Sequence, residues 1–215
     1  MFLTTFFSQI LQACLSNRKR VLSLFYMMYA AFFLVVPLLS YILVTQPDAY
    51  VWITFLGKSA GQLSVLLFFA ATYPGILGRF RMRHPLITLG MSFRRHIGIS
   101  SFLLGLGHAL LVYIVPALQT GTFFRALTAY VLFGMVALFI FFLLFVTSND
   151  VSVKLLGPKW KLLHKSVYIA YWIIFLHVMF QKVGIFAYLI GISATLEMMS
   201  LLYDFLKKRE IPVSS

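Results

Sequence analysis

Six stretches of the sequence are each apolar over the length that a helix needs to cross a lipid bilayer, roughly 20 residues. They lie at about 21–44, 56–78, 95–118, 126–147, 163–182 and 184–206. The whole chain is 61% hydrophobic and only 11% charged, whereas soluble domains are about half apolar. We therefore predict an all-α protein, folded as a six-helix transmembrane bundle in a lipid bilayer.

The positive charges are spread unevenly over the loops between these spans. Fifteen of the 18 lysines and arginines lie before the first span, between spans two and three, between spans four and five, or after the last span; the other three are Lys58, Arg125 and Lys182. Positive residues gather on the cytoplasmic side of membrane proteins. We therefore expect both termini in the cytoplasm. This topology accounts for the net charge of +13, so we expect no nucleic-acid partner.

The remaining segments add no second domain. Residues 1–15 are apolar but short, with polar residues on one side, so we expect an interfacial helix instead of a seventh span. No long linker, repeat or low-complexity segment interrupts the chain, and we treat 1–215 as a single domain. The one cysteine, Cys14, excludes an internal disulfide and any cysteine-held zinc or iron–sulfur site.

Four of the five histidines fall on two spans. His96 and His108 lie on the third, and His164 and His177 lie on the fifth. Odd-numbered spans run in the same direction, and the two histidines of each helix differ in height by about 18 and 20 Å. If these helices pack together, His96 can pair with His164 near the cytoplasm, and His108 with His177 further across. Around the helix axis, however, the two histidines of the third span lie about 120° apart, and those of the fifth about 140° apart. Both pairs could form only if the helices tilt, kink or cross, so the spacing supports the deeper pair better.

Two neutral imidazoles facing each other within apolar helices suit b-type heme, which takes axial histidines in a flat apolar slot. Glycines let a macrocycle approach the backbone, and Gly98, Gly105 and Gly107 lie close to His108. Zinc is less favoured, because closed zinc sites use cysteine and tighter clusters. The alternative is that each histidine merely hydrogen-bonds a neighbouring helix.

Two segments around these histidines resemble a known family. "FRRHIGISSFLLGLGHALLVY" (93–113) and "TSNDVSVKLLGPKWKLLHKSVYIAYWIIFLH" (147–177) are similar to segments of the MsrQ/YedZ family, the heme-binding membrane subunit of the periplasmic methionine sulfoxide reductase. That family belongs to the ferric-reductase-like transmembrane domains, which the NADPH oxidases share. The family's heme histidines correspond to His108, His164 and His177. His96 does not correspond to a family ligand, and rests on helix geometry alone.

The resemblance implies one or two b hemes that pass electrons across the membrane to a periplasmic reductase such as a molybdoprotein. The sequence has no Gly-rich dinucleotide fingerprint on a strand–helix unit, so we expect an electron-transfer subunit and not a self-sufficient enzyme. Its donor would be a cytoplasmic flavin reductase, which brings FMN, or membrane quinol. Arg94, Arg95 and Lys165 are candidates for binding heme propionates, and the cytoplasmic arginines for binding a flavin phosphate.

Glu197 is the one carboxylate that we expect well inside a span, and intramembrane acids are candidates for functional sites. It could carry protons at a quinone site, or pair with Lys165 or Arg95. Two other functions remain open at this stage. One is the transmembrane component of a ferric or metal-chelate reductase, and the other is a non-redox transporter or scaffold with structural histidines.

Overall fold

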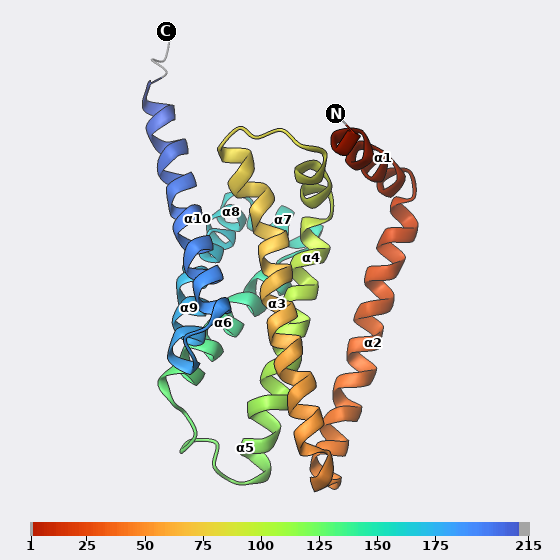
Figure 1. Ribbon diagram of the computed structural model, residues 1–215, viewed down its shortest axis with the longest axis vertical. Helices are drawn as coiled ribbons and strands as arrows, with labels where there is room; N and C mark the ends of the chain where they lie inside the picture. Colours follow the sequence, from red (N-terminus) through yellow and green to blue (C-terminus); the bar gives the residue numbers. More distant parts are fainter. Residues whose placement is uncertain (1, 211–215) are drawn as a thin grey trace.

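A computed structural model describes residues 2–210, and every regular element within that range is a helix (Figure 1). In chain order the elements are α1 (Phe2–Ser16), α2 (Arg18–Thr45), η1 (Pro47–Ala49), α3 (Tyr50–Arg79), α4 (Pro85–Ala109), η2 (Leu110–Ile114), α5 (Val115–Gln119), α6 (Ala129–Val146), α7 (Asp150–Leu156), α8 (Pro158–His164), α9 (Ser166–Gln181) and α10 (Ile185–Glu210). The element η1 is a short 3-10 helix, and η2 is one stretch of π-helix.

The prediction of six spans is confirmed. Six helical segments are long and apolar enough to cross a membrane, namely Arg18–Thr45, Pro47–Arg79, Pro85–Gln119, Ala129–Val146, Pro158–Gln181 and Ile185–Lys207. The third is longer than expected, because α4 begins at Pro85, where proline's fixed φ suits a first helical turn. The chain is an integral, multi-pass membrane protein.

The first helix and the end of the last one lie at the same end of the bundle, as an even number of spans requires (Figure 1). The 80–84 loop and the short helices α7 and α8 lie toward this end too, which we call the basic end. The loops 46–49 and 120–128 and the turn at 182–184 lie toward the other end, which we call the outer end. Helix α1, predicted to be interfacial, lies across the basic end of α2.

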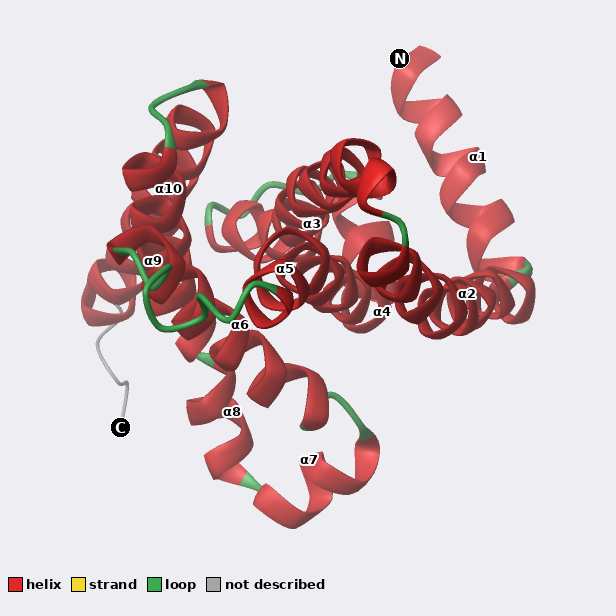
Figure 2. Ribbon diagram, turned by 90° about the horizontal axis from the view of Figure 1, so that it is seen from below, coloured by secondary structure: helices red, strands yellow, loops and turns green. Residues whose placement is uncertain are grey.

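The six spans form a bundle with α3 and α4 at its centre (Figure 2). Helix α6 packs on α9, and α10 packs on both α9 and α3, while α2 and α1 lie on the opposite side of the central pair. The pairing of histidines considered from the sequence had, as its condition, that the third and fifth spans pack together. In the structure α4 and α9 are not among the close helix pairs, and a cavity lies between them toward the outer end.

Small residues allow α3 and α4 to approach closely. Ser64 donates a hydrogen bond to the carbonyl of Ser101 at 2.7 Å, and Ser101 donates one to the carbonyl of Ser64 at 2.9 Å. Nearer the basic end, a Cβ added at Gly90 would come within 2.5 Å of Pro74 Cγ. Small residues and interhelical hydrogen bonds are the means by which membrane helices associate without a hydrophobic driving force. This rigid pair is the frame that carries His108.

Candidate functional site

A cavity of about 700 Å³ opens among α3, α4, η2, α6, α9 and α10. Its size falls within the range of 300–1,000 Å³ that is usual for small-molecule and cofactor sites. Its walls are largely apolar, with Val65, Phe68, Leu138 and Ile174 among them, and the imidazoles of His108 and His177 reach it from two sides. The cavity therefore combines an apolar slot with two convergent ligand groups.

The ring of His108 is fixed by helix α3. Its Nδ1 atom lies 3.0 Å from the carbonyl oxygen of Gly57. Because a carbonyl oxygen can only accept, Nδ1 must carry the hydrogen, and the neutral ring then keeps a free lone pair on Nε2. Metal-binding histidines in proteins use their second ring nitrogen in this way, which sets the tautomer and the ring orientation.

The ring of His177 is fixed in the same way by helix α6. Its Nδ1 atom lies 2.7 Å from the carbonyl oxygen of Tyr130, so the hydrogen again lies on Nδ1 and the lone pair on Nε2. Two histidines on different helices thus present the same nitrogen, each supported by a neighbouring backbone carbonyl.

A glycine completes each of these supports. The ring of His108 lies over Gly61, where an added Cβ would come within 2.8 Å of the imidazole, and the ring of His177 lies over Gly134 at the same distance. Each glycine follows its carbonyl residue by four positions, Gly61 after Gly57 and Gly134 after Tyr130, which is one helical turn. The carbonyl orients the ring, and the missing side chain one turn later leaves room for it.

The two rings are spaced to hold one metal atom between them. Their centroids lie 6.3 Å apart and their planes are inclined at 76°. Two metal–imidazole bonds of about 2 Å, together with ring radii of about 1.1 Å, require a separation of about 6 Å. The tautomers, the spacing and the apolar cavity all fit an axial bis-histidine heme.

The π-helix η2 begins two residues after His108. Pro116 lacks the amide that would bond the carbonyl of Val112 in a regular α-helix, which accounts for a widened turn here. Leu111 and Val112 of this turn pack on Gly57, where an added Cβ would meet them at 3.0 and 2.7 Å. The wide turn therefore lies against the same residue whose carbonyl holds His108.

The inner pair expected from helix height is not formed. His96 faces α2: its ring lies 5.3 Å from that of Phe25 and 5.7 Å from that of Tyr26, and the hydroxyl of Tyr29 lies 3.2 Å from its Nδ1. The reason is rotation. His96 lies about 120° around the helix from His108, so it points away from the cavity.

His164 has a separate environment at the basic end. Its ring stacks on Trp160 at 4.0 Å between centroids, and its Nε2 lies 3.1 Å from the hydroxyl of Thr147. Gly157, with φ of +51°, lies between α7 and α8. The turn at this glycine sets the direction of α8, the helix that carries Trp160 and His164. Arg94 and Arg95 are close enough to His164 to interact with it electrostatically. The structure thus brings His164 together with these two arginines, but not with His96.

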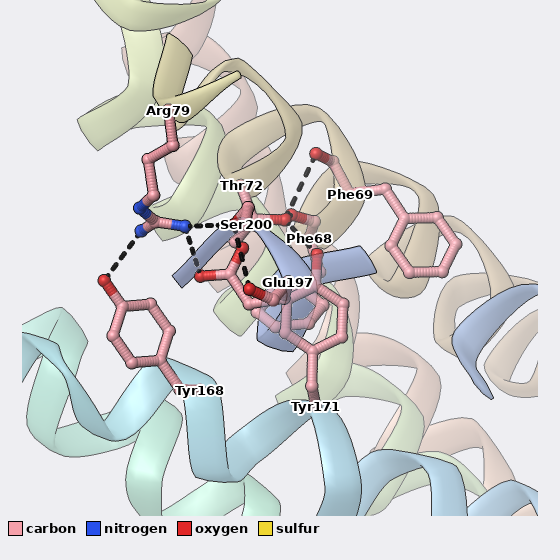
Figure 3. A network of polar contacts seen from close by, with 8 residues as sticks. All are labelled: Phe68, Phe69, Thr72, Arg79, Tyr168, Tyr171, Glu197 and Ser200. Atoms are coloured by element: carbon pink, nitrogen blue, oxygen red, sulfur yellow. Dashed lines mark hydrogen bonds and ion pairs between the residues drawn. The ribbon is translucent and has the colours of Figure 1, made fainter. Parts of the chain in front are cut away.

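Glu197 lies in a polar network between α3, α9 and α10 (Figure 3). Its partner is Arg79, whose Nη1 lies 2.9 Å from Oε1, and not Lys165 or Arg95, the partners named in one of the two alternatives left open by the sequence. Arg79 also donates to the hydroxyls of Ser200 at 2.8 Å and Tyr168 at 2.8 Å. Arg79 is the last residue of α3, whereas the sequence placed it in the loop after the second span. No sequence motif indicates this network.

The network leaves one acceptor atom unused. Glu197 is only 4% exposed, and within residues 2–210 its Oε2 atom has no hydrogen-bond partner. Arg95 instead pairs with Asp150 at the surface, with 2.7 Å between Nη2 and Oδ1. Since Arg95 is engaged with Asp150, Arg94 is the freer of the two arginines near His164.

The chain resembles known proteins over the region that holds this cavity. The family model described as "ferric reductase like transmembrane component" matches residues 56–176, which include His108 and His164. The protein-methionine-sulfoxide reductase heme-binding subunits MsrQ of Brucella anthropi and Brucella ovis are 32% and 30% identical, over 56% of this chain. These matches confirm the resemblance predicted from the sequence.

The chain spans only part of those relatives, because the matches cover 60% of their length. No solved structure matches this chain. The family model alone covers more than half of the chain, from within α3 into α9, and ends one residue before His177. This protein therefore belongs to the family of ferric reductase like transmembrane components.

Proposed function

We propose that this protein is a membrane b-type heme protein that carries electrons from one face of the membrane to the other. The observation that carries the proposal is the pair His108 and His177, whose rings lie 6.3 Å apart in an apolar cavity. The name of the MsrQ relatives supports it, because those proteins are described as heme-binding subunits.

In this proposal His108 and His177 would hold the heme iron through their Nε2 atoms. When bound, heme supplies an iron that gains and loses one electron without a proton. The protein contributes rigidity and low polarity: the carbonyls of Gly57 and Tyr130 hold the two rings in place. The apolar walls exclude water, so little solvent needs to reorganise when charge arrives.

A second heme near the basic end is a further part of the proposal. His164 would be its ligand, and Arg94, which lies near His164, would bind a propionate with Arg95 beside it. For iron to bind there, the contact between His164 Nε2 and the Thr147 hydroxyl must open. His96 as a fourth ligand stays a prediction, and its contacts with α2 do not support it.

We propose that electrons enter at the basic end and leave at the outer end. This direction follows from the positive-inside rule, which makes the basic end cytoplasmic. The donor would be a cytoplasmic flavin reductase, with FMN bound by the arginines, or membrane quinol, with Glu197 Oε2 as a proton acceptor. The acceptor would be a periplasmic methionine sulfoxide reductase, such as a molybdoprotein, and the location a bacterial inner membrane.

An optical spectrum tests the proposal. The purified protein, produced with a supply of heme, should show the bands of low-spin b heme in a reduced-minus-oxidised difference spectrum. A well-folded but colourless preparation would reject the heme function, and would favour a non-redox transporter or scaffold with structural histidines.

A second candidate function keeps the heme but changes the acceptor. The family description, ferric reductase like, favours a metal-chelate reductase whose acceptor is a small ferric complex. Proteoliposomes with donor inside and either ferric chelate or oxidised periplasmic reductase outside would separate the two, because only the true acceptor should be reduced at a useful rate.

A further inference from the structure

Two of the three positive residues expected on the outer side line the heme-sized cavity. They are Lys58 on α3 and Lys182 in the turn after α9, and Gln62 and Gln181 line the cavity beside them. The third, Arg125, is not among the lining residues. Positive residues are disfavoured on the outer side of a membrane protein. Topology therefore does not explain why both lysines stand at this cavity.

Nothing in the described structure neutralises these two lysines. The ion pairs Arg79–Glu197 and Arg95–Asp150 lie away from the outer end and involve neither lysine. Asp48, which lies in η1, is not a lining residue of the cavity. Lys58 is also close enough to His108 to interact with it electrostatically. A site with two imidazoles thus has two uncompensated positive charges at its edge.

Both lysines are exposed at the rim of the cavity, and two positive charges beside a cavity attract an anionic ligand. We propose that Lys58 and Lys182 form a carboxylate-binding subsite that holds the two propionates of the heme between His108 and His177. This inference rests on the proposed function. The charges balance: two ammonium groups meet two carboxylates, and the iron bears its charge at the apolar centre. Gln62 and Gln181 can donate amide hydrogens to the same carboxylates.

This subsite would orient the heme with its propionates toward the outer end and its apolar edge toward Val65 and Phe68. The lysines would also raise the reduction potential, since a positive charge near the iron favours the more negative, reduced state. Carboxylates of an external acceptor are the other source of the same chemistry. The experiment must therefore separate groups on the heme from groups on a partner.

The decisive experiment compares protoheme with its dimethyl ester, in which both propionates lack charge. Wild-type apoprotein in detergent should bind protoheme tighter than the ester by roughly tenfold or more, because charge-assisted hydrogen bonds are lost in the ester. The double variant Lys58→Met/Lys182→Met should lose most of this preference. The matched control Arg125→Met should keep all of it.

A redox titration gives a second readout. The double variant should have a lower midpoint potential than wild type, and Arg125→Met should leave it unchanged. If wild type binds heme and its ester equally well, the subsite is rejected while the heme function stands. If the heme preference is kept in the double variant but reduction of an acidic acceptor loses its salt dependence, the lysines serve the acceptor, and the subsite is again rejected. A wild-type protein that binds neither porphyrin rejects both proposals.

Discussion

The two ends of this bundle use their polar residues in opposite ways. At the outer end, His108 and His177 each use one ring nitrogen to contact a backbone carbonyl, and present the other nitrogen beside an apolar cavity. At the basic end, the polar side chains pair with each other: Arg79 holds Glu197, and the His164 ring contacts Thr147 and Trp160.

The difference teaches that a carbonyl partner and a side-chain partner leave a histidine in different states. A carbonyl can only accept, so it fixes one tautomer and leaves Nε2 free for a metal. The hydroxyl of Thr147 already donates its one hydrogen to the carbonyl of Leu143 at 2.7 Å, so it accepts from His164 and places a hydrogen on Nε2, the nitrogen that a metal would need. By this criterion the outer pair is prepared for a metal, and His164 must first give up a contact.

Removal of an outer histidine should have the largest effect. His108→Ala or His177→Ala should abolish most bound heme, because each removes one of the two imidazoles that would hold the iron in the proposed function. Heme per protein, measured by the pyridine hemochrome absorbance, checks this. His84→Ala is the control, because His84 lies at the N-terminus of α4 in contact with Phe7. Equal heme loss in the control would contradict the assignment.

Disruption of the inner ion pair should reduce stability instead of heme binding. Glu197→Gln leaves the Arg79 charge without its carboxylate in a partly buried site, which should cost less than the roughly 3–5 kcal/mol of a fully buried pair. Thermal unfolding in detergent checks this, and heme content at low temperature should stay near that of wild type. The double variant Arg79→Met/Glu197→Gln should be more stable than Glu197→Gln alone. If it is not, the pair is not the source of the effect.

Glutamine at position 197 also tests the quinol hypothesis. It keeps an acceptor oxygen but cannot take up a proton at neutral pH. If Glu197 accepts protons from quinol, reduction of the heme by quinol should slow in Glu197→Gln while reduction by dithionite is unchanged. Equal rates with both reductants would assign Glu197 to the ion pair alone.

A methyl group placed beneath either outer ring should have an intermediate effect. Gly61→Ala or Gly134→Ala puts a Cβ within 2.8 Å of an imidazole, and overpacking of this kind costs about 1–3 kcal/mol. Heme affinity should fall by roughly tenfold to a hundredfold. Gly98→Ala is the matched control, because nothing lies within 4 Å of the added Cβ there. A similar loss in the control would place the cause in the helix backbone.

The inner histidines should differ from each other. His164→Ala should remove only the second, inner heme and leave the bands of the outer one, whereas His96→Ala should change neither heme content nor spectra, because its ring faces α2. Spectral titration of both variants checks this. A spectral change in His96→Ala would restore it as a ligand and contradict the observed orientation.

Much of the fold could be predicted from the sequence, because apolar length alone decides where helices span a bilayer. The height match of His108 and His177 could also be predicted, since rise per residue is constant. Rotation could not, because it depends on which neighbour each helix face packs against. This is why helix height suggested the pairing of His96 with His164, and why Arg79 was not among the partners considered for Glu197.

The supports of the outer histidines were outside the reach of sequence reasoning for a related reason. Glycines were sought on the helix of His108, whereas the glycines that hold the rings, Gly61 and Gly134, belong to the facing helices. One signal was present in retrospect. Both glycines interrupt apolar spans, where glycine lowers helix stability relative to alanine and so indicates a close approach.

The smallest effect is expected at the surface pair that joins α7 to α4. The Arg95 guanidinium donates a hydrogen bond to Asp150 and lowers the pKa of that carboxyl below its ordinary value of 3.8. A depressed carboxyl pKa contributes stability above the ordinary value, and this contribution is lost as the pH falls through the lowered one. Because Asp150 is fully exposed, solvent and salt screen the pair strongly.

Asp150→Asn should therefore leave heme content and quinol reduction unchanged at neutral pH, and should lower the unfolding temperature there only slightly. This small difference from wild type should disappear below about pH 4, where the wild-type carboxyl takes up its proton. Unfolding temperature measured from pH 3 to 7 in low salt checks this. A clear loss of the His164-associated heme in Asp150→Asn would contradict it, because Arg95 released from Asp150 should be more available to a propionate, not less. In that case Asp150 would hold α7, and with it α8 and His164, in place, and the basic end would depend on a surface contact that the outer end does not need.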